Sequence, residues 1–170
     1  YTQGSQWAPA ISNLKNGGFV VCWGASQQDG NGSDVYAQRY DKDCRKTGGE
    51  FRVNTYTQSL QQSPSICGLN DGGFVVCWES LYQDSSDYGV YAQRYDKKSR
   101  KTGAEFRVNS YTERSQSDPA ISSLENGGFV ICWTSDDQDG SGQGVYAQRY
   151  DKDSRKTGDK FRVNSFTARN

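Results

Sequence analysis

The chain repeats itself every 55 residues, and this period constrains its fold more than any other feature. The heptapeptide GGFVVCW occupies residues 17–23 and 72–78, and the near-identical GGFVICW occupies residues 127–133. The segment VYAQRYDK also recurs once per copy, first at residues 35–42, with no insertion between copies. A fixed period of this size is typical of propellers, solenoids and other architectures that stack one supersecondary unit on the next.

The repeat divides the chain into three units, residues 1–55, 56–110 and 111–165. Residues 166–170 align with the opening of each unit, and we expect them to begin a further copy. The units then form either one domain or part of a longer array.

Each unit reads as four short strands. In the third unit the expected strands are residues 119–124, 129–133, 145–150 and 160–166, separated by turns and loops rich in Gly, Asn and Asp. Strand content is indicated by β-branched and aromatic residues, and no segment shows a helical period. Within residues 129–133, both sets of alternate residues are apolar, so we expect this strand to be buried on both faces.

Four antiparallel strands per unit predict an all-β fold of β-propeller-type blades, with a β-trefoil or an open β stack as alternatives. Blades are favoured because a 55-residue unit is long for a trefoil lobe, and because the partial fourth copy breaks threefold symmetry. Propellers usually close with about 4–8 blades. Three units would therefore need another chain, more copies, or an open stack in which each unit covers its neighbour.

The repeat resembles a known tandem repeat of large secreted and surface proteins of bacteria and some protists. That pattern is GGFVVxWxSxxQDGxGxGVYxQRFDxxG followed by FxVNT, and residues 127–165 read GGFVICWTSDDQDGSGQGVYAQRYDKDSRKTGDKFRVNS. The resemblance covers all three units, although a Lys/Arg-rich turn replaces the usual Asp-x-x-Gly. It implies an extracellular, non-catalytic β module of adhesive or matrix-like proteins, located outside the cell or on its surface.

Several kinds of chemistry are excluded or disfavoured by composition. The chain has no His, so Ser-His-Asp and Cys-His arrangements are excluded. It also lacks the Cys-x-x-Cys motif that would indicate a zinc site. Its 20 basic and 20 acidic residues balance without a basic stripe, which argues against nucleic acid as a partner. No apolar run approaches the ~20 residues of a membrane helix, so we expect no membrane insertion by this segment. We expect no enzyme activity.

The expected function is therefore a structural or adhesive one, in which β units stack on copies of the chain or on further repeats. The first alternative is a multivalent carbohydrate-binding lectin, whose partners would be glycans and whose weak sites would gain avidity from repetition. The second alternative is a propeller scaffold that binds proteins.

The polar loop after each repeated Trp offers oxygen ligands at alternate positions, as calcium loops do. The alternative is a hairpin loop without an ion. The candidate ligands for Ca²⁺ are Asp29, Asn31, Asp34, Asp84, Asp87, Asp137 and Asp139.

An Arg and an Asp two residues apart recur in each VYAQRYD segment. A buried Arg needs a carboxylate or several carbonyl groups. The expected structural ion pairs are Arg39–Asp41, Arg94–Asp96 and Arg149–Asp151. Such an Arg either ties one blade to the next or faces a ligand in a repeated sugar pocket.

Five cysteines and one sequon complete the candidate sites. Cys67 lies on the strand before Cys77, opposite it or one step off, so a cross-strand disulfide is one interpretation. Small buried thiols are the other, with Cys44 in a turn as the exposed one. Asn31 begins the sequence Asn-Gly-Ser and is a candidate glycosylation site in a secreted protein.

Overall fold

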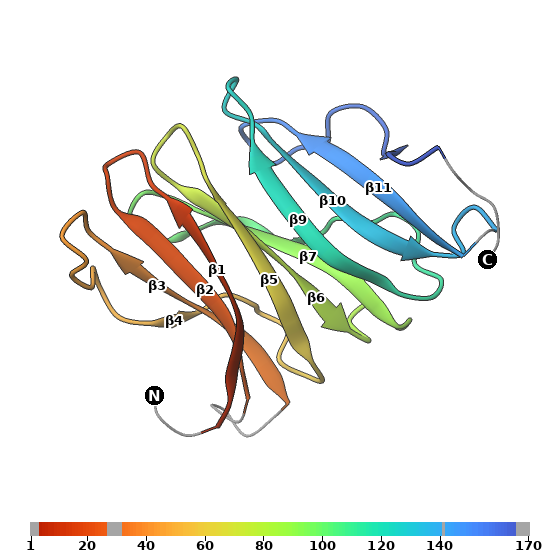
Figure 1. The fold of residues 1–170 in the computed structure, drawn as a ribbon, viewed down its shortest axis with the longest axis horizontal. Helices are drawn as coiled ribbons and strands as arrows, with labels where there is room; N and C mark the ends of the chain where they lie inside the picture. Colours follow the sequence, from red (N-terminus) through yellow and green to blue (C-terminus); the bar gives the residue numbers. More distant parts are fainter. Residues whose placement is uncertain (1–3, 27–31, 141, 166–170) are drawn as a thin grey trace.

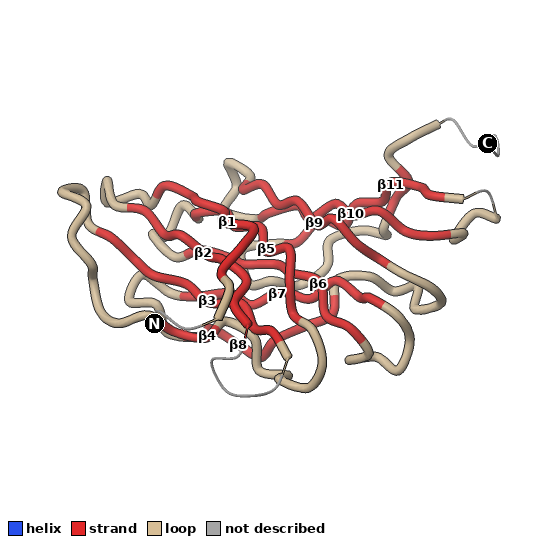
Figure 2. The backbone as a smooth tube through the Cα atoms, turned by 60° about the horizontal axis from the view of Figure 1, so that its bottom comes forward, coloured by secondary structure: helices blue, strands red, loops and turns tan. Residues whose placement is uncertain are grey.

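The computed structural model of the chain describes residues 4–26, 32–140 and 142–165. In this part every regular element is a strand (Figures 1 and 2), and no helix has the length and apolar character needed to cross a bilayer. The strands are β1 (Gln6–Asn13), β2 (Phe19–Ser26), β3 (Ser33–Tyr40), β4 (Phe51–Arg52), β5 (Gln61–Gly68), β6 (Phe74–Leu81), β7 (Tyr88–Tyr95), β8 (Lys101–Arg107), β9 (Gln116–Ser123), β10 (Phe129–Asp136), β11 (Gln143–Tyr150) and β12 (Phe161–Arg162).

Each repeat unit forms one four-stranded antiparallel sheet whose strands lie in sequence order. The three sheets stand side by side in chain order (Figure 1). Their first strands lie next to one another, because β5 contacts both β1 and β9. This is the arrangement of blades around an axis, so the expected all-β fold of blade-like units is confirmed, and three separate sheets replace the trefoil alternative.

The paired glycines of the repeated heptapeptide make the turn between the first two strands. Gly72 has a φ of +84°, a left-handed conformation that favours glycine. A Cβ on Gly73 would lie 2.3 Å from the carbonyl oxygen of Tyr95. Both positions therefore exclude a side chain, and the same turn recurs in all three units.

The register of β6 and β7 gives each sheet two faces. Phe74, Val76 and Trp78 lie opposite Tyr95, Gln93 and Tyr91, which places all six on one side, called here the front face. The intervening residues form the rear face, which in this unit carries Val75, Cys77, Val90, Ala92 and Val108. Seven of the eight residues of β6 are buried, as expected for a strand that is covered on both sides.

The hydrophobic core lies between the units and not inside any one of them. One cluster joins rear-face residues of unit 1, such as Val20 and Val35, to front-face residues of unit 2, such as Phe74 and Trp78. A second cluster joins the rear face of unit 2 to the front face of unit 3 in the same way. Each unit therefore depends on its neighbours for burial, as in other repeat proteins.

The last strand differs from the expectation, because the segment expected as strand 160–166 pairs only over Phe161–Arg162. The ladder continues through a side chain, since the Val145 N–H donates to Asn164 Oδ1 at 2.9 Å. Asn54 and Asn109 do the same in units 1 and 2, and each is 1% exposed. Asn54 and Asn109 are buried because their amide carbonyls replace a backbone acceptor.

Candidate functional site

The front face of unit 1 has no unit packed on it among the described residues. Trp78 and Trp133, its counterparts in units 2 and 3, are 0% and 1% exposed, whereas Trp23 is only partly buried. Ile11 is 64% exposed, whereas the equivalent Ile66 is 7% exposed. The open face therefore presents the side chains that form the core elsewhere in the chain.

This open front face contains a hollow of about 370 Å³. Its lining residues are Gln6, Trp7, Pro9, Val21, Trp23, Tyr40 and Glu50. In units 2 and 3 the counterparts of Gln6, which are Gln61 and Gln116, are fully buried beneath the preceding unit. The hollow is thus half of a junction that the chain forms twice internally.

The aromatic side chains of the open face are already arranged as they are in a covered one. Phe19 and Tyr40 stack with ring centroids 4.9 Å apart, and the pairs Phe74–Tyr95 and Phe129–Tyr150 have the same separation. At a covered junction, a phenylalanine from the preceding rear face adds to the stack. The ring centroids are 5.3 Å apart for Phe51 and Tyr95, and 5.4 Å apart for Phe106 and Tyr150.

The rear face of unit 3 is the other open end. Phe161, the counterpart of Phe51, is 52% exposed, and Val163 is 57% exposed. The corresponding Val53 and Val108 are 0% and 1% exposed because the next unit covers them. The two ends of the chain therefore expose complementary halves of the same apolar junction.

Polar contacts also cross the internal junctions. The Tyr95 hydroxyl donates to the Val53 carbonyl at 3.1 Å, and the Asn109 amide donates to Gln116 Oε1 at 2.8 Å. Burial raises the pKa of the Tyr95 phenol, so this hydroxyl stays protonated and acts as a donor. These bonds align neighbouring blades beyond what apolar packing specifies.

None of the three repeated arginines forms its expected ion pair in the described part of the chain. Arg39 is buried and donates to the Lys97 carbonyl of unit 2, so it joins two units. Arg94 pairs with Asp71 at 2.6 Å and not with Asp96. Arg149 is exposed on the open rear face and has no ion pair among the described residues. Arg39 therefore contacts the next unit, whereas Arg94 contacts an aspartate of its own unit that unit 1 replaces with Asn16.

The aspartates expected as their partners instead cap the turn that follows. Asp96 Oδ1 accepts the backbone N–H groups of Lys98 and Arg100 at 2.8 and 2.9 Å. These bonds, led by the one from Arg100, lower the pKa of Asp96 to about 2. Asp41 and Asp151 accept equivalent bonds, and their pKa values are lowered for the same reason.

Three carboxylates of the expected calcium loops are engaged by the arginine of the FRVN segment. The Arg–Asp distances are 3.7 Å for Arg52–Asp34, 3.5 Å for Arg107–Asp84 and 2.8 Å for Arg162–Asp139. Asp137 pairs with Arg114 at 3.3 Å, and Asp87 is exposed. Asp29 and Asn31 lie outside the described residues, so their roles in a metal site or as a glycan acceptor stay predictions. No group of three potential metal ligands occurs in the described part of the chain.

All five cysteines are thiols, so the cross-strand disulfide is not present. The register explains why: Cys67 lies opposite Val75, and Cys77 lies opposite Ser65, which places the two cysteines diagonally. Burial raises the pKa of Cys67 to about 12 and that of Cys77 well above its ordinary value. These two are unreactive packing residues, whereas Cys44 is exposed.

The glutamine beside each arginine has a role that the sequence reasoning missed. Gln93 Nε2 donates to the carbonyls of Arg94 and Gly103, at 2.9 and 3.3 Å. Gln38 and Gln148 make the same pair of bonds in units 1 and 3. Its invariance across three copies was the available signal that it holds the third strand to the turn that follows.

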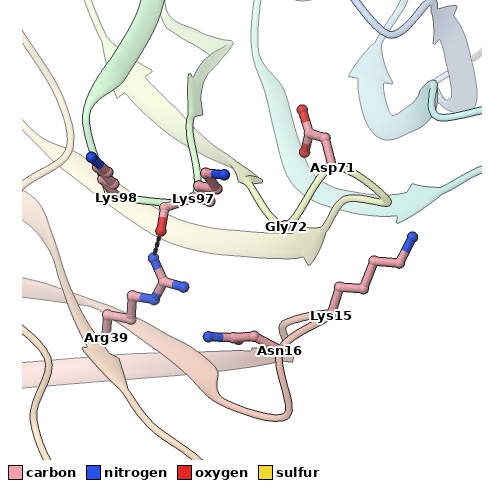
Figure 3. A pocket seen from close by; sticks show the side chains of 7 residues that line it. All are labelled: Lys15, Asn16, Arg39, Asp71, Gly72, Lys97 and Lys98. Carbon is pink, nitrogen blue, oxygen red and sulfur yellow. Dashed lines mark hydrogen bonds between the residues drawn. The ribbon is translucent and has the colours of Figure 1, made fainter.

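The junction between units 1 and 2 also forms a hollow of about 400 Å³ at the surface (Figure 3). Arg39 reaches into it from β3, and the turns of both units supply the remaining lining residues. These are Lys15, Asn16, Asp71, Gly72, Lys97 and Lys98.

No protein-family model and no curated protein matches the chain. Solved structures are similar in fold. A protein of unknown function from Dyadobacter fermentans superposes with a TM-score of 0.67 at 12% identity, over 92% of this chain and 55% of its own. The native arabinanase of Bacillus subtilis superposes with a TM-score of 0.56 at 18% identity, over 94% of this chain and 60% of its own.

A fucose lectin from Kordia zhangzhouensis, solved with methyl-fucoside, gives a TM-score of 0.54 at 11% identity, over 94% of this chain and 99% of its own. The chain spans only 55% of the Dyadobacter protein and 60% of the arabinanase. At these identities the comparisons show the fold, which is that of propeller-like domains.

Proposed function

We propose that the chain is a non-catalytic, extracellular structural or adhesive module that associates end to end. In this association, the rear face of unit 3 docks on the front face of unit 1 of a second copy. The observation that carries the proposal is the pair of open faces, which expose both halves of a junction that the chain uses twice internally. Phe161 of one copy would complete the aromatic stack of Phe19 and Tyr40 in the next.

The strength of this contact follows from what it buries. Burying an apolar side chain contributes about 1.5–3 kcal/mol, and Ile11, Phe161 and Val163 are each more than half exposed. Association costs about 4–15 kcal/mol in lost translational and rotational freedom, which offsets much of that gain. We therefore expect reversible, concentration-dependent association.

Sedimentation equilibrium over a concentration series tests the proposal. The wild type should gain mass with concentration, and both Phe161→Asp and Ile11→Asp should stay monomeric because each places a charge on one end face. Tyr82→Asp is the matched control, because Tyr82 is 60% exposed in the β6–β7 loop, away from both ends.

Mixing the two variants makes the test specific for head-to-tail contact. Phe161→Asp retains an intact front face and Ile11→Asp retains an intact rear face, so an equimolar mixture should form a dimer and nothing larger. A mixture that stays monomeric, or a wild type that shows no association at any concentration, would refute the proposal.

The second candidate is carbohydrate binding at the same open face. Its support is the lining of the front-face hollow, which combines the aromatic residues Trp7 and Trp23 with the polar residues Gln6 and Glu50. Sugar-binding pockets commonly combine apolar rings with a few placed polar groups. The fucose lectin adds a reason to use methyl-fucoside as the first probe.

The Phe161→Asp monomer suits this experiment, because its front face is unaltered. Saturable quenching of tryptophan fluorescence by methyl-fucoside, lost in Trp23→Ala, would favour the lectin. No response to this sugar or to a glycan array would leave association as the function of this face.

A further inference from the structure

The groove between units 1 and 2 carries an excess of positive charge that the equivalent groove between units 2 and 3 lacks. Two adjoining hollows, of about 400 and 460 Å³, share Arg39, Lys97 and Lys98. Lys15 extends the row of cations at the edge of the first hollow (Figure 3). The cations therefore follow an elongated surface and do not surround a single point.

These cations have little compensation within the protein. Lys15, Lys97 and Lys98 are exposed, and none has an ion pair in the described part of the chain. Asp71 is the one described carboxylate that lines either hollow, and its Oδ2 already accepts a hydrogen bond from Arg94 at 2.6 Å. The groove thus presents four cations against one carboxylate that is already engaged.

Arg39 gives the groove a fixed charge at its centre. It is 7% exposed, and its contact with the Lys97 carbonyl holds the guanidinium between the two units. A guanidinium has five N–H donors, and the Lys97 carbonyl is the acceptor that the described residues supply. Arg39 itself lines both hollows.

The junction between units 2 and 3 provides an internal comparison. There Arg94 pairs with Asp71, and Lys152 pairs with Asp153 at 3.1 Å. The counterpart of Lys15 is Asn70, whose amide donates to the Glu125 carbonyl at 2.9 Å. The same architecture is therefore neutralised at one junction and left cationic at the other.

We propose that the groove between units 1 and 2 binds an acidic polysaccharide, through sulfate or carboxylate groups that contact Lys15, Arg39, Lys97 and Lys98. Two hollows in line suit consecutive anionic groups along a polymer. A polynucleotide fits less well, since single-stranded nucleic acids stack their bases on aromatic side chains. The lining contains one aromatic residue, Phe51, which packs against Tyr95.

Binding of fluorescent dextran sulfate, measured by polarisation at low ionic strength, tests the proposal. Neutral dextran is the control polymer, and polygalacturonate distinguishes carboxylate from sulfate recognition. Both walls of the groove belong to one chain, so the Phe161→Asp monomer should bind as the wild type does. That separates this proposal from end-to-end association and from sugar binding at the front face.

The double variant Lys97→Gln/Lys98→Gln should weaken dextran sulfate binding about fivefold to thirtyfold, because it removes two exposed charge contacts. Lys152→Gln/Arg155→Gln removes the same charge from the equivalent turn of unit 3 and should change affinity by less than about twofold. Lys98→Asp, which installs the residue found at the neutral junction, should weaken binding further.

Three results would overturn the proposal. An absence of dextran sulfate binding would show that the groove is not an anion site. Equal losses in both double variants would mean diffuse attraction to the whole surface. Tighter binding of single-stranded oligothymidine than of either acidic polysaccharide would assign the groove to nucleic acid instead.

Discussion

Trp23, Trp78 and Trp133 occupy the same position in the three copies of the repeated heptapeptide, and replacing each by alanine isolates what a neighbouring unit contributes. Each tryptophan follows a cysteine on the second strand of its unit and lies opposite a tyrosine of the third strand. The main difference is the cover, since units 1 and 2 bury Trp78 and Trp133, while the front face carrying Trp23 is open.

The expected magnitudes follow from burial. Trp78 and Trp133 are 0% and 1% exposed, and deleting a fully buried tryptophan side chain costs about 3–5 kcal/mol of unfolding free energy. Trp23 keeps part of its surface in water, so its replacement should cost only about 1 kcal/mol in the dissociated chain. The difference measures the contribution of the covering unit.

Urea unfolding monitored by circular dichroism, in the Phe161→Asp background to remove association, gives the free energies. The slope with denaturant must be compared across variants, because repeat proteins lose cooperativity when one junction is weakened. If Trp23→Ala costs as much as Trp78→Ala, then each blade is stable by itself, and the placement of the core between units would be refuted.

Three further predictions concern single groups. The pKa of Asp96 is lowered to about 2, so its capping bonds stabilise the fold fully at pH values above the unfolded pKa of about 3.9. This contribution is lost as the pH falls toward 2. The wild type should therefore lose unfolding free energy in urea across this pH range, and Asp96→Asn should lose less. A thiol reagent added to the native protein should modify Cys44 first. After denaturation without reductant, the reagent should label all five cysteines, and a count below five would indicate a disulfide. Because Arg107 already contacts Asp84, millimolar CaCl₂ should leave the melting temperature unchanged, and a rise would support the calcium loops.

Much of the fold could be predicted from the sequence because it depends on short-range rules. Paired glycines specify the turn before Phe74, alternation specifies the strands, and the fixed period specifies that one arrangement recurs. The length of the last strand could not be predicted, since Asn54 and Asn109 substitute side-chain carbonyls for backbone ones. The sequence does not distinguish an asparagine that continues a strand ladder from one that faces solvent.

The contacts between units were largely beyond sequence reasoning, because they depend on how one blade meets the next. Arg39 and Arg94 lie in identical segments, yet one contacts a carbonyl of the next unit and the other contacts Asp71. The difference traces to position 71, where unit 2 has an aspartate and unit 1 has Asn16. A single repeat considered alone would assign all three arginines the same partner.

The cationic groove arises from the same kind of small departure from the repeat. The copies differ at the turn residues, where Lys98 stands in place of Asp43 and Asp153, and Lys15 stands in place of Asn70 and Glu125. The apolar residues that form the junctions are almost unchanged. Selection for stacking alone explains the constant residues, because every unit must fit the next one, but it places no demand on exposed turn residues. The residues that vary between copies are therefore the ones that can give one junction a binding property that the others lack, and the charge-swapped variant Lys98→Asp examines that property directly.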